Sequence, residues 1–504
     1  MNRTQKFALN SLATAVNQLV VMIVGLITPR LMIASYGSEV NGLVSSLNQF
    51  IGYITLVEAG IGGAAVFSLY KPLAENNQSG VSRIVMAARK GYRQAGYIFS
   101  TGIFLLAVCY GLLCSTPTLQ FSTIFPLTLI LGANGCIDFF LVSGYRTLLT
   151  ADQRTYIIAF AGTAQTILRT VIIVLLAVGK VNVVLLYLLA LLPVLIKVLT
   201  IGMYSKKNYA YLDFKAQPDQ SALNKRWDVI FQQILGTVQV GAPTVIATVL
   251  LDLLQVSVYS VYNMVMSGVN GLLSIFISGL PAGFGELIAK KEEQTLKTTV
   301  AEFEVAYYYI LSIAYAITFV LILPFIRVYT QGLTDVNYYN PILALMIVLN
   351  GLLYNIKTPQ SMLIISAGMY KETRWRVAIQ GALVIVCGFA FGAKWGLAGI
   401  MAGSCVSNLY RTIDLLFFVP KRITKLNVKK TIFRMLRVFL NIALVMLLSC
   451  FVKVQATGYL AWAGYAVVFG ISSVIITTVT TWIFDRKAFY SLFGRAKSIL
   501  LRGR

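Results

Sequence analysis

Apolar runs of about twenty residues recur from one end of the chain to the other, and they constrain its fold more than any other feature. A helix needs roughly 20 such residues to cross the hydrocarbon core of a bilayer. The runs take up most of the 504 residues, of which 58% are hydrophobic and 12% charged, so no separate globular domain of ordinary size fits beside them. The chain is therefore predicted to be an all-α polytopic membrane protein.

We predict about 14 transmembrane helices, whose ends are located to within a few residues. The main alternative is a count of twelve. The expected spans are roughly 8–34, 41–69, 95–114, 121–147, 156–178, 182–204, 229–251, 256–282, 303–326, 341–366, 376–393, 397–419, 436–453 and 460–484. The N-terminus, MNRTQKFALN, runs into the first span without a small-residue cleavage signal, which predicts that it is kept as part of the first helix.

Basic residues outnumber acidic ones, 42 against 18, and give a formal net charge of +24. In a soluble protein this balance would indicate a nucleic-acid partner. Here the basic residues lie in every second loop, as the positive-inside rule requires of cytoplasmic loops, so no nucleic-acid partner is expected. When the first helix is entered from the inside, the outer loops hold only Lys180, Arg327, Lys394 and Lys453. Both termini are therefore predicted to be cytoplasmic.

Neither metal chemistry nor catalysis is expected. The six cysteines lie in apolar segments without metal-ligand spacing, and the chain has no His. A G-x-x-x-x-G-K-[ST] phosphate loop is missing from the sequence, as is any large loop that would carry membrane transferase chemistry. The sequence predicts a transporter without catalytic residues, metal or cofactor, and leaves coupling to H⁺ or Na⁺ open.

The basic segment from Lys71 to Arg93 has two interpretations. Val81, Ile84 and Val85 share one helical face, which favours a short amphipathic helix lying on the inner leaflet. A solvated basic loop is the alternative.

An internal duplication is indicated by two pairs of segments. AGIGGAAVFSLYKPLAE (59–75) and SGLPAGFGELIAKKEE (278–293) both combine a Gly-rich helix end with a following Lys and Glu. Lys197 in the sixth span and Arg411 in the twelfth both precede a basic pair by about ten residues. Spans one to six would then repeat as seven to twelve in the same orientation. The expected parts are an N-terminal lobe at 1–204, a cytoplasmic inter-lobe loop at 205–228, a C-terminal lobe at 229–419, and a basic loop, two further helices and a basic tail at 420–504.

Ionisable residues inside the spans are the sharpest functional signal, because an unpaired charge in hydrocarbon costs roughly 2.5–3.5 kcal/mol on insertion scales. The embedded candidates are Arg30, Glu58, Asp138, Arg169, Lys197, Lys357, Arg411 and Asp414. Five are cations and three are anions, an excess that favours an anionic ligand for Arg30, Arg169, Lys357, Lys197 and Arg411. Glu58, Asp138 and Asp414 would then serve as counter-ions or in ion coupling.

Each candidate also has a plainer explanation. Arg169 lies about thirteen residues into its span, some 20 Å deep at ~1.5 Å per residue, and faces either a polar cavity or a structural partner such as Asp138 or Glu58. Lys357 precedes Thr358-Pro359, where a kink frees backbone carbonyls.

The remaining cations have local explanations as well. Arg30 can reach the outer headgroups, and Lys197 can reach the inner interface. Arg411 can do the same, or pair with Asp414 at a spacing of i, i+3. Prolines that would bend or break spans are Pro29, Pro126, Pro193, Pro243, Pro281, Pro324 and Pro359.

Three segments resemble a known family. ITPRLMIASYGSEVNGLVSSLNQFIGYITLVEAGIGGAAVFSLY (27–70) resembles the N-terminal pattern of Wzx-type polysaccharide repeat-unit flippases, which belong to the multidrug/oligosaccharidyl-lipid/polysaccharide exporter superfamily. VSVYSVYNMVMSGVNGLLSIFISGLPAGFGELIA (256–289) looks like the matching stretch of the second lobe, and LVSGYRTLLTADQRTYI (141–157) is similar to the loop after the fourth helix.

The resemblance implies two six-helix lobes around a central cavity, with two C-terminal helices added. It implies transport of an undecaprenyl-pyrophosphate-linked oligosaccharide, a capsule, O-antigen or exopolysaccharide repeat unit, across a bacterial inner (plasma) membrane by alternating access. Arg30 stands where such flippases carry a cation in the first helix. Membrane lipids, a polysaccharide polymerase and glycosyltransferases would be the partners.

Three other functions compete with this interpretation. A lipid II flippase of peptidoglycan synthesis would share the architecture but is expected to have a more charged first helix. An ion-coupled multidrug antiporter would be expected to rely on embedded carboxylates more than on cations. A membrane glycosyltransferase or polymerase is disfavoured because every outer loop is short.

Overall fold

The computed structural model describes residues 3–219, 221, 226–277, 280–452, 454–486 and 490. Across those residues every regular element is helical, and 13 helices are long and apolar enough to cross a membrane. The all-α, multi-pass fold predicted from the apolar runs is thus confirmed. Lys453, the basic tail from Lys487 onward except residue 490, and most of the segment 220–225 lie outside the described residues, as do positions 278 and 279 of the repeated segment.

Two compact units make up the chain, Met1–Thr248 and Val249–Arg504. The division falls near the end of α10 (Arg226–Leu250), most of which belongs to the first unit. Near this end of α10, the hydroxyl of Thr248 lies 2.6 Å from the hydroxyl of Ser46, which belongs to the first unit as well. The finer division into lobes, linker and appendix remains a prediction.

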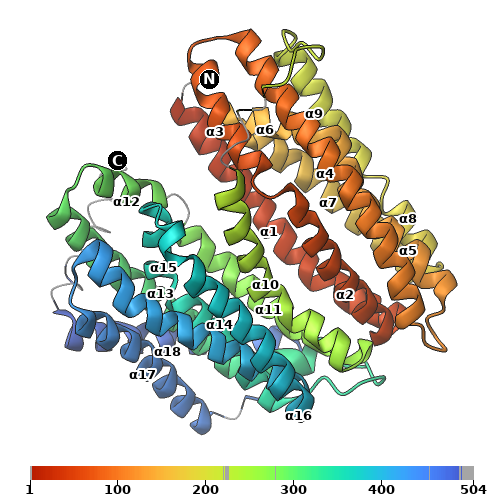
Figure 1. The fold of residues 1–504 in the computed structure, drawn as a ribbon. Coiled ribbons are helices and arrows are strands. Elements are labelled where there is room, and N and C mark those ends of the chain that lie inside the picture. Colours follow the sequence, from red (N-terminus) through yellow and green to blue (C-terminus); the bar gives the residue numbers. More distant parts are fainter. Residues whose placement is uncertain are drawn as a thin grey trace. The chain divides into compact units, whose positions relative to one another are not determined.

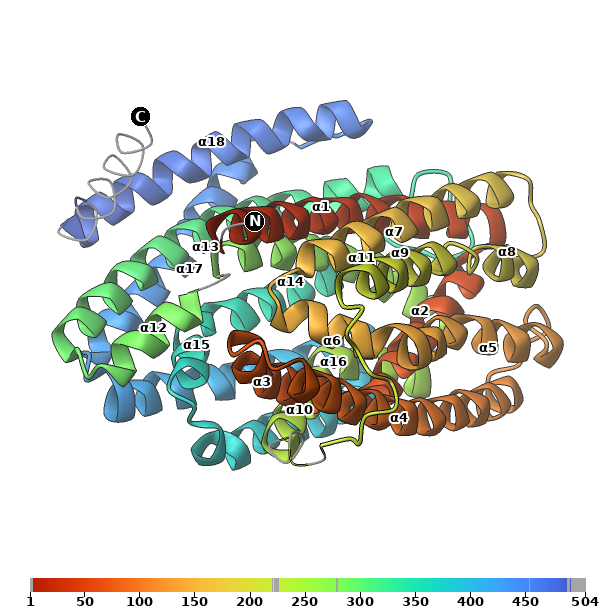
Figure 2. The same cartoon turned by 90° about the horizontal axis from the view of Figure 1, so that it is seen from above.

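The first unit is a bundle in which α1 packs along α7 and α4 along α5 (Figures 1 and 2). Besides α10, its helices are α1 (Arg3–Tyr36), α2 (Ser38–Thr55), α3 (Ile61–Ala74), α4 (Gln78–Leu113), α5 (Phe121–Ile137), α6 (Ser143–Ala151), α7 (Thr155–Val178), α8 (Val183–Leu189) and α9 (Val194–Asn208). A 3₁₀ turn, η1 (Leu56–Glu58), links α2 to α3, and a π turn, η2 (Asp138–Val142), links α5 to α6.

In the second unit the long helix α13 is flanked by α17 and α18, while α14 packs against α16 (Figure 2). The helices of this unit are α11 (Leu253–Ile277), α12 (Leu280–Ala289), α13 (Glu293–Tyr329), α14 (Pro341–Ile356), α15 (Thr358–Ser366), α16 (Tyr370–Val419), α17 (Val428–Phe451) and α18 (Tyr459–Phe484).

The element α16 holds two spans rather than one. Gly396 has φ 59° and ψ −141°, a conformation open to glycine, and it breaks the helix between the predicted spans 376–393 and 397–419. The two halves pack closely, because a Cβ on Gly399 would clash with the carbonyl oxygen of Phe391 and one on Gly403 would lie 2.5 Å from the nitrogen of Gly388. Small residues of this kind allow helix backbones to approach inside a membrane. When α16 is counted as two spans, the 13 candidate helices agree with the predicted number of about 14 spans.

Several spans are interrupted, and the interruptions lie beside ionisable residues. Gly60, with φ 80°, separates η1 from α3 directly after Glu58. The π turn starts at Asp138, Pro193 precedes α9, and Lys357 is the single residue between α14 and α15. Broken helices free backbone groups that need protein or water partners in a membrane.

The predicted amphipathic surface helix is wrong. The segment that carries Val81, Ile84 and Val85 is the first part of the 36-residue helix α4, which continues into the membrane span without a break. These side chains are buried in a cluster that also includes Leu69 and Leu148, from α3 and α6. The apolar face therefore packs within the protein instead of on the inner leaflet.

The order of elements is the same in the two halves of the chain. In each half a pair of consecutive helices (α2 with α3, α11 with α12) leads into a long helix, α4 of 36 residues or α13 of 37. A second interrupted span follows, α5–η2–α6 or α14–α15. This order supports the duplication that the sequence indicated.

Candidate functional site

Asp138 and Lys197 form an ion pair within the first unit. The Nζ of Lys197 lies 2.8 and 2.7 Å from the two carboxylate oxygens of Asp138. The side chains are 22% and 13% exposed. Asp138 opens the π turn and Lys197 lies one turn after Pro193, so two helix interruptions bring the residues together although they are 59 positions apart. The lysine charge is neutralised inside the bundle.

Glu58 is paired in the same unit with Arg146. The Nη2 of Arg146, from α6, donates to Oε2 of Glu58 at 2.9 Å. Glu58 also lies near enough to Asp138 and Lys197 for electrostatic interaction, so the two pairs form one cluster. Arg146 lies at the end of the predicted fourth span, 121–147, and the sequence does not single it out as an embedded candidate.

Arg169 stands apart from this cluster. The alternative in which it pairs with Asp138 or Glu58 is wrong, because both carboxylates are engaged by other cations. Arg169 instead lines a small polar cavity between α5, α7 and α8, together with Asn134, Gln165 and Tyr187 as its polar neighbours. Within the part of the chain that the structure describes, its side chain makes no hydrogen bond or ion pair.

Lys357 is buried, at 6% exposure, as is Arg411 at 5%. Its Nζ donates to the carbonyl oxygen of Tyr354 at 3.1 Å and to Oδ1 of Asn408 at 2.7 Å. It also lies 4.4 Å from the centre of the Tyr354 ring, in a cation–π contact. These partners are neutral, and among the described residues no carboxylate forms an ion pair with Lys357.

Arg411 and Asp414 form the ion pair at i, i+3 that their spacing suggests, with Nη1 of Arg411 2.6 Å from Oδ2 of Asp414. Asp414 also accepts from Arg376 of the other half of α16. Arg411 lies close enough to Lys357 for electrostatic interaction. One carboxylate therefore serves two arginines beside a buried lysine. Arg376 is the first residue of the predicted span 376–393, and the sequence does not single it out as a candidate.

The carboxylates are shared differently in the two units. In the first unit, Glu58 and Asp138 each neutralise one cation, and Arg169 has no acidic partner among the described residues. In the second unit, the cationic cluster of Lys357, Arg376 and Arg411 has Asp414 as its one acidic partner within the described residues. A buried positive charge without an acidic partner, such as that of Lys357, is costly unless an anion offsets it.

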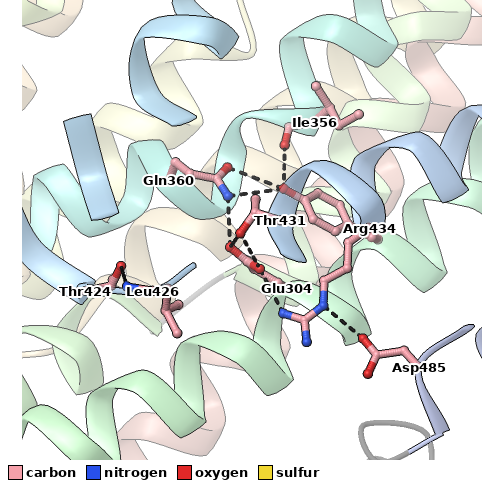
Figure 3. A network of polar contacts seen from close by, with 9 residues as sticks. Glu304, Ile356, Gln360, Thr424, Leu426, Thr431, Arg434 and Asp485 are labelled. Atoms are coloured by element: carbon pink, nitrogen blue, oxygen red, sulfur yellow. Dashed lines mark hydrogen bonds and ion pairs between the residues drawn. The ribbon is translucent and has the colours of Figure 1, made fainter. Parts of the chain in front are cut away.

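A further buried network in the second unit centres on Glu304, which is 3% exposed. Glu304 accepts from Gln360 at 3.0 Å and from Arg434 at 3.0 Å (Figure 3). Arg434 also donates to Asp485 at 3.0 Å, beyond the end of α18. The network ties α13, α15, α17 and the end of α18 together. Sequence analysis missed it, because Glu304 lies at the start of a predicted span and Arg434 in a predicted loop.

Arg30 lies in α1 directly after Pro29 and is partly exposed. The described part of the chain contains no group of three or more His, Cys, Asp or Glu side chains that could hold a metal ion. Around Lys357 the structure brings together cations and amides, which suit phosphate and carbonyl oxygens.

Comparison with models of protein families gave no match, and neither did comparison with curated proteins. Solved structures, in contrast, share the fold. A multidrug resistance MATE family transporter of the MOP superfamily, inward-facing, superposes with a TM-score of 0.66 at 13% identity, covering 84% of this chain and 99% of that one. Lipid II flippase MurJ, in an inward closed conformation, gives a TM-score of 0.68 at 14% identity, covering 94% and 99%.

An outward-facing MATE family transporter gives a TM-score of 0.60 at 13% identity, covering 84% of this chain and 96% of that one. At these identities the likeness concerns the fold alone. The chain has the fold of MOP-superfamily transporters.

Proposed function

We propose that this protein is a flippase that moves an undecaprenyl-pyrophosphate-linked oligosaccharide from the inner to the outer leaflet of a bacterial plasma membrane by alternating access. The unbalanced cationic cluster of Lys357, Arg376 and Arg411 carries the proposal. A pyrophosphate is a doubly charged anion whose oxygens accept hydrogen bonds from guanidinium and ammonium groups. Binding it would offset the positive excess that the protein alone leaves in place.

The neighbours of the cluster suit the sugar part of the same ligand. Asn408 is 8% exposed and Gln380 is 2% exposed, and both contribute amides beside Lys357. Asn350 accepts from Asn408 at 2.9 Å and extends this row of amides. Amide groups both donate and accept hydrogen bonds, as sugar hydroxyls require.

A lipid II flippase is the second candidate, because the likeness to MurJ extends over 94% of this chain against 84% for the MATE structures. Both candidates would carry an anionic lipid-linked sugar. A multidrug antiporter for cationic drugs is less well supported. Glu58, Asp138, Glu304 and Asp414 all form ion pairs with cations of the protein itself.

The test is transfer of fluorescent undecaprenyl-pyrophosphate oligosaccharide across proteoliposomes, with lipid II and a cationic dye as alternative substrates, with and without H⁺ or Na⁺ gradients. Lys357→Gln and Asn408→Asp are the informative variants, since the first removes the excess charge and the second neutralises it. Lys357→Arg keeps the charge, and Lys371→Gln removes an exposed lysine as a matched control.

We expect both neutralising variants to lose transfer of the oligosaccharide at least tenfold while Lys357→Arg and Lys371→Gln retain it. Transfer of lipid II but not of the oligosaccharide would assign the second candidate. Gradient-dependent movement of the dye, with no transfer of either lipid, would overturn the proposal.

A further inference from the structure

A groove of about 520 Å³ opens on the first unit between α4, the π turn η2, α6 and α9. Its walls are mostly apolar and its two cations are Arg89 and Lys206. Its apolar lining includes Phe139, Phe140, Leu141, Val198, Leu199 and Met203. The proposed transport function uses none of these side chains.

The apolar walls of the groove are accessible at three positions. Leu141, Leu199 and Met203 are 54%, 57% and 64% exposed. The floor is shaped by glycine, since a Cβ built on Gly202 of α9 meets nothing within 4 Å. The π turn supplies Phe139, Phe140 and Leu141 to this wall. An exposed apolar groove on a membrane helix bundle suits a hydrocarbon chain.

The cations give the groove a charged side. The guanidinium of Arg89 lies 5.1 Å from the centre of the Phe214 ring, in a cation–π contact, and its N–H groups make no hydrogen bond with the described residues. Lys206 lies in the last turn of α9, where Lys207 follows. Within the described ranges neither Arg89 nor Lys206 forms an ion pair. Two cations beside an apolar wall match one negative phosphodiester above an acyl chain.

We propose that this groove is a binding site for an anionic glycerophospholipid of the bilayer, with its phosphodiester on Arg89 and Lys206 and one acyl chain along Leu141, Leu199 and Met203. The positive-inside pattern predicts that this end of the unit faces the cytoplasm, so the lipid would come from the inner leaflet. Charge decides the headgroup: phosphatidylglycerol brings a single negative charge, whereas phosphatidylcholine adds a quaternary ammonium that the two cations repel.

The experiment measures lipid retained by the full chain after delipidation in detergent and incubation with phosphatidylglycerol or phosphatidylcholine, using native mass spectrometry. The charge variant is Arg89→Gln with Lys206→Gln. Its matched control is Lys90→Gln with Lys207→Gln, which changes the same net charge at the adjacent positions without touching the groove. A basic residue at an anionic membrane surface contributes roughly fivefold in affinity, so we expect about 25-fold weaker phosphatidylglycerol binding in the charge variant and no change in its control.

A second pair of variants tests the groove independently of charge. Gly202→Leu fills the floor, and Gly202→Ala leaves most of the volume free. Both replace a helical glycine at an open position, so both are expected to fold, as thermal unfolding would verify. Loss of phosphatidylglycerol in Gly202→Leu with retention in Gly202→Ala would support the site.

Equal retention of the two phospholipids by the unchanged protein would overturn the proposal, as would equal losses in the charge variant and its control. Displacement of phosphatidylglycerol by an equimolar amount of undecaprenyl phosphate would also overturn it, because the groove would then prefer a polyprenyl lipid. These outcomes are independent of transport, since Lys357→Gln is expected to bind phosphatidylglycerol normally.

Discussion

At the scale of residues, Asp414 is the position on which most of the charge balance of the second unit depends. Its side chain is 7% exposed and accepts from Arg411, which is 6% exposed, and from the half-exposed Arg376. Replacing Asp414 by Asn leaves the guanidinium of Arg411 buried without a counter-charge. Breaking a buried pair from one side costs about 3–5 kcal/mol. We expect Asp414→Asn to lower the apparent unfolding temperature markedly in detergent.

The matched variant is Arg376→Gln, which removes the more exposed partner and leaves Arg411 paired. Its expected cost is at most about 1 kcal/mol, as for exposed ion pairs. Equal unfolding temperatures for Asp414→Asn and Arg376→Gln would contradict the assigned burial.

The sequence predicts which charged residues lie inside the spans, but it does not predict most of the residues that they contact. Arg411 and Asp414 are one helical turn apart, so their pairing follows from local geometry. Asp138 and Lys197 are 59 positions apart, and Lys357 and Asn408 are 51 apart, so their contacts depend on how helices pack. The periodicity of a single helix does not predict contacts between residues so far apart in the sequence.

At the scale of elements, the glycine contact within α16 controls how two spans fold back on each other. We expect Gly399→Ala to destabilise the protein by about 1–3 kcal/mol, because the added methyl group clashes with the backbone of Phe391, which cannot rotate away. Gly464→Ala in α18 is the control. A Cβ there meets nothing within 4 Å, so helix propensity predicts a neutral or slightly stabilising effect.

Thermal unfolding of both variants in the same detergent measures the difference. An unfolding temperature of Gly399→Ala equal to that of Gly464→Ala would show that the halves of α16 do not pack through these glycines.

The spans themselves were predictable, because each requires a long apolar run and the bilayer fixes its length. The predicted fifth span, 156–178, differs from α7 by one residue at its start. The fate of the segment after α3 was not predictable. An amphipathic face fits either a membrane surface or a neighbouring helix, and only the packing of Val81 and Ile84 against α3 and α6 decides between them.

At the scale of the whole molecule, the topology predicted from basic loops calls for a direct test. In a cysteine-free background, Gln120→Cys lies between α4 and α5, and Lys215→Cys lies between α9 and α10; both positions are exposed. We expect a membrane-impermeant maleimide added to spheroplasts to label Gln120→Cys, and to label Lys215→Cys only after lysis. The reverse pattern would invert the assigned orientation.

The duplication gives a comparison that separates stability from function. The fourth span of each half carries an ionisable residue that contacts the sixth, Asp138 with Lys197 in one half and Lys357 with Asn408 in the other. The first contact is charge-balanced and the second is cationic. Removing charge should therefore have opposite effects on stability in the two halves.

Asp138→Asn leaves Lys197 uncompensated at 13% exposure, so we expect it to destabilise the protein by about 3–5 kcal/mol. Adding Lys197→Gln to Asp138→Asn should restore much of the loss, since no unpaired charge then remains. Lys357→Gln, in contrast, removes a buried charge that has no acidic partner among the described residues, and should leave the unfolding temperature unchanged or raise it. Retaining such a lysine at a cost in stability is reasonable for a protein whose substrate supplies the missing negative charge. If Lys357→Gln unfolds at a lower temperature to the same extent as Asp138→Asn, the lysine has a structural role and the anionic-substrate argument loses its main support.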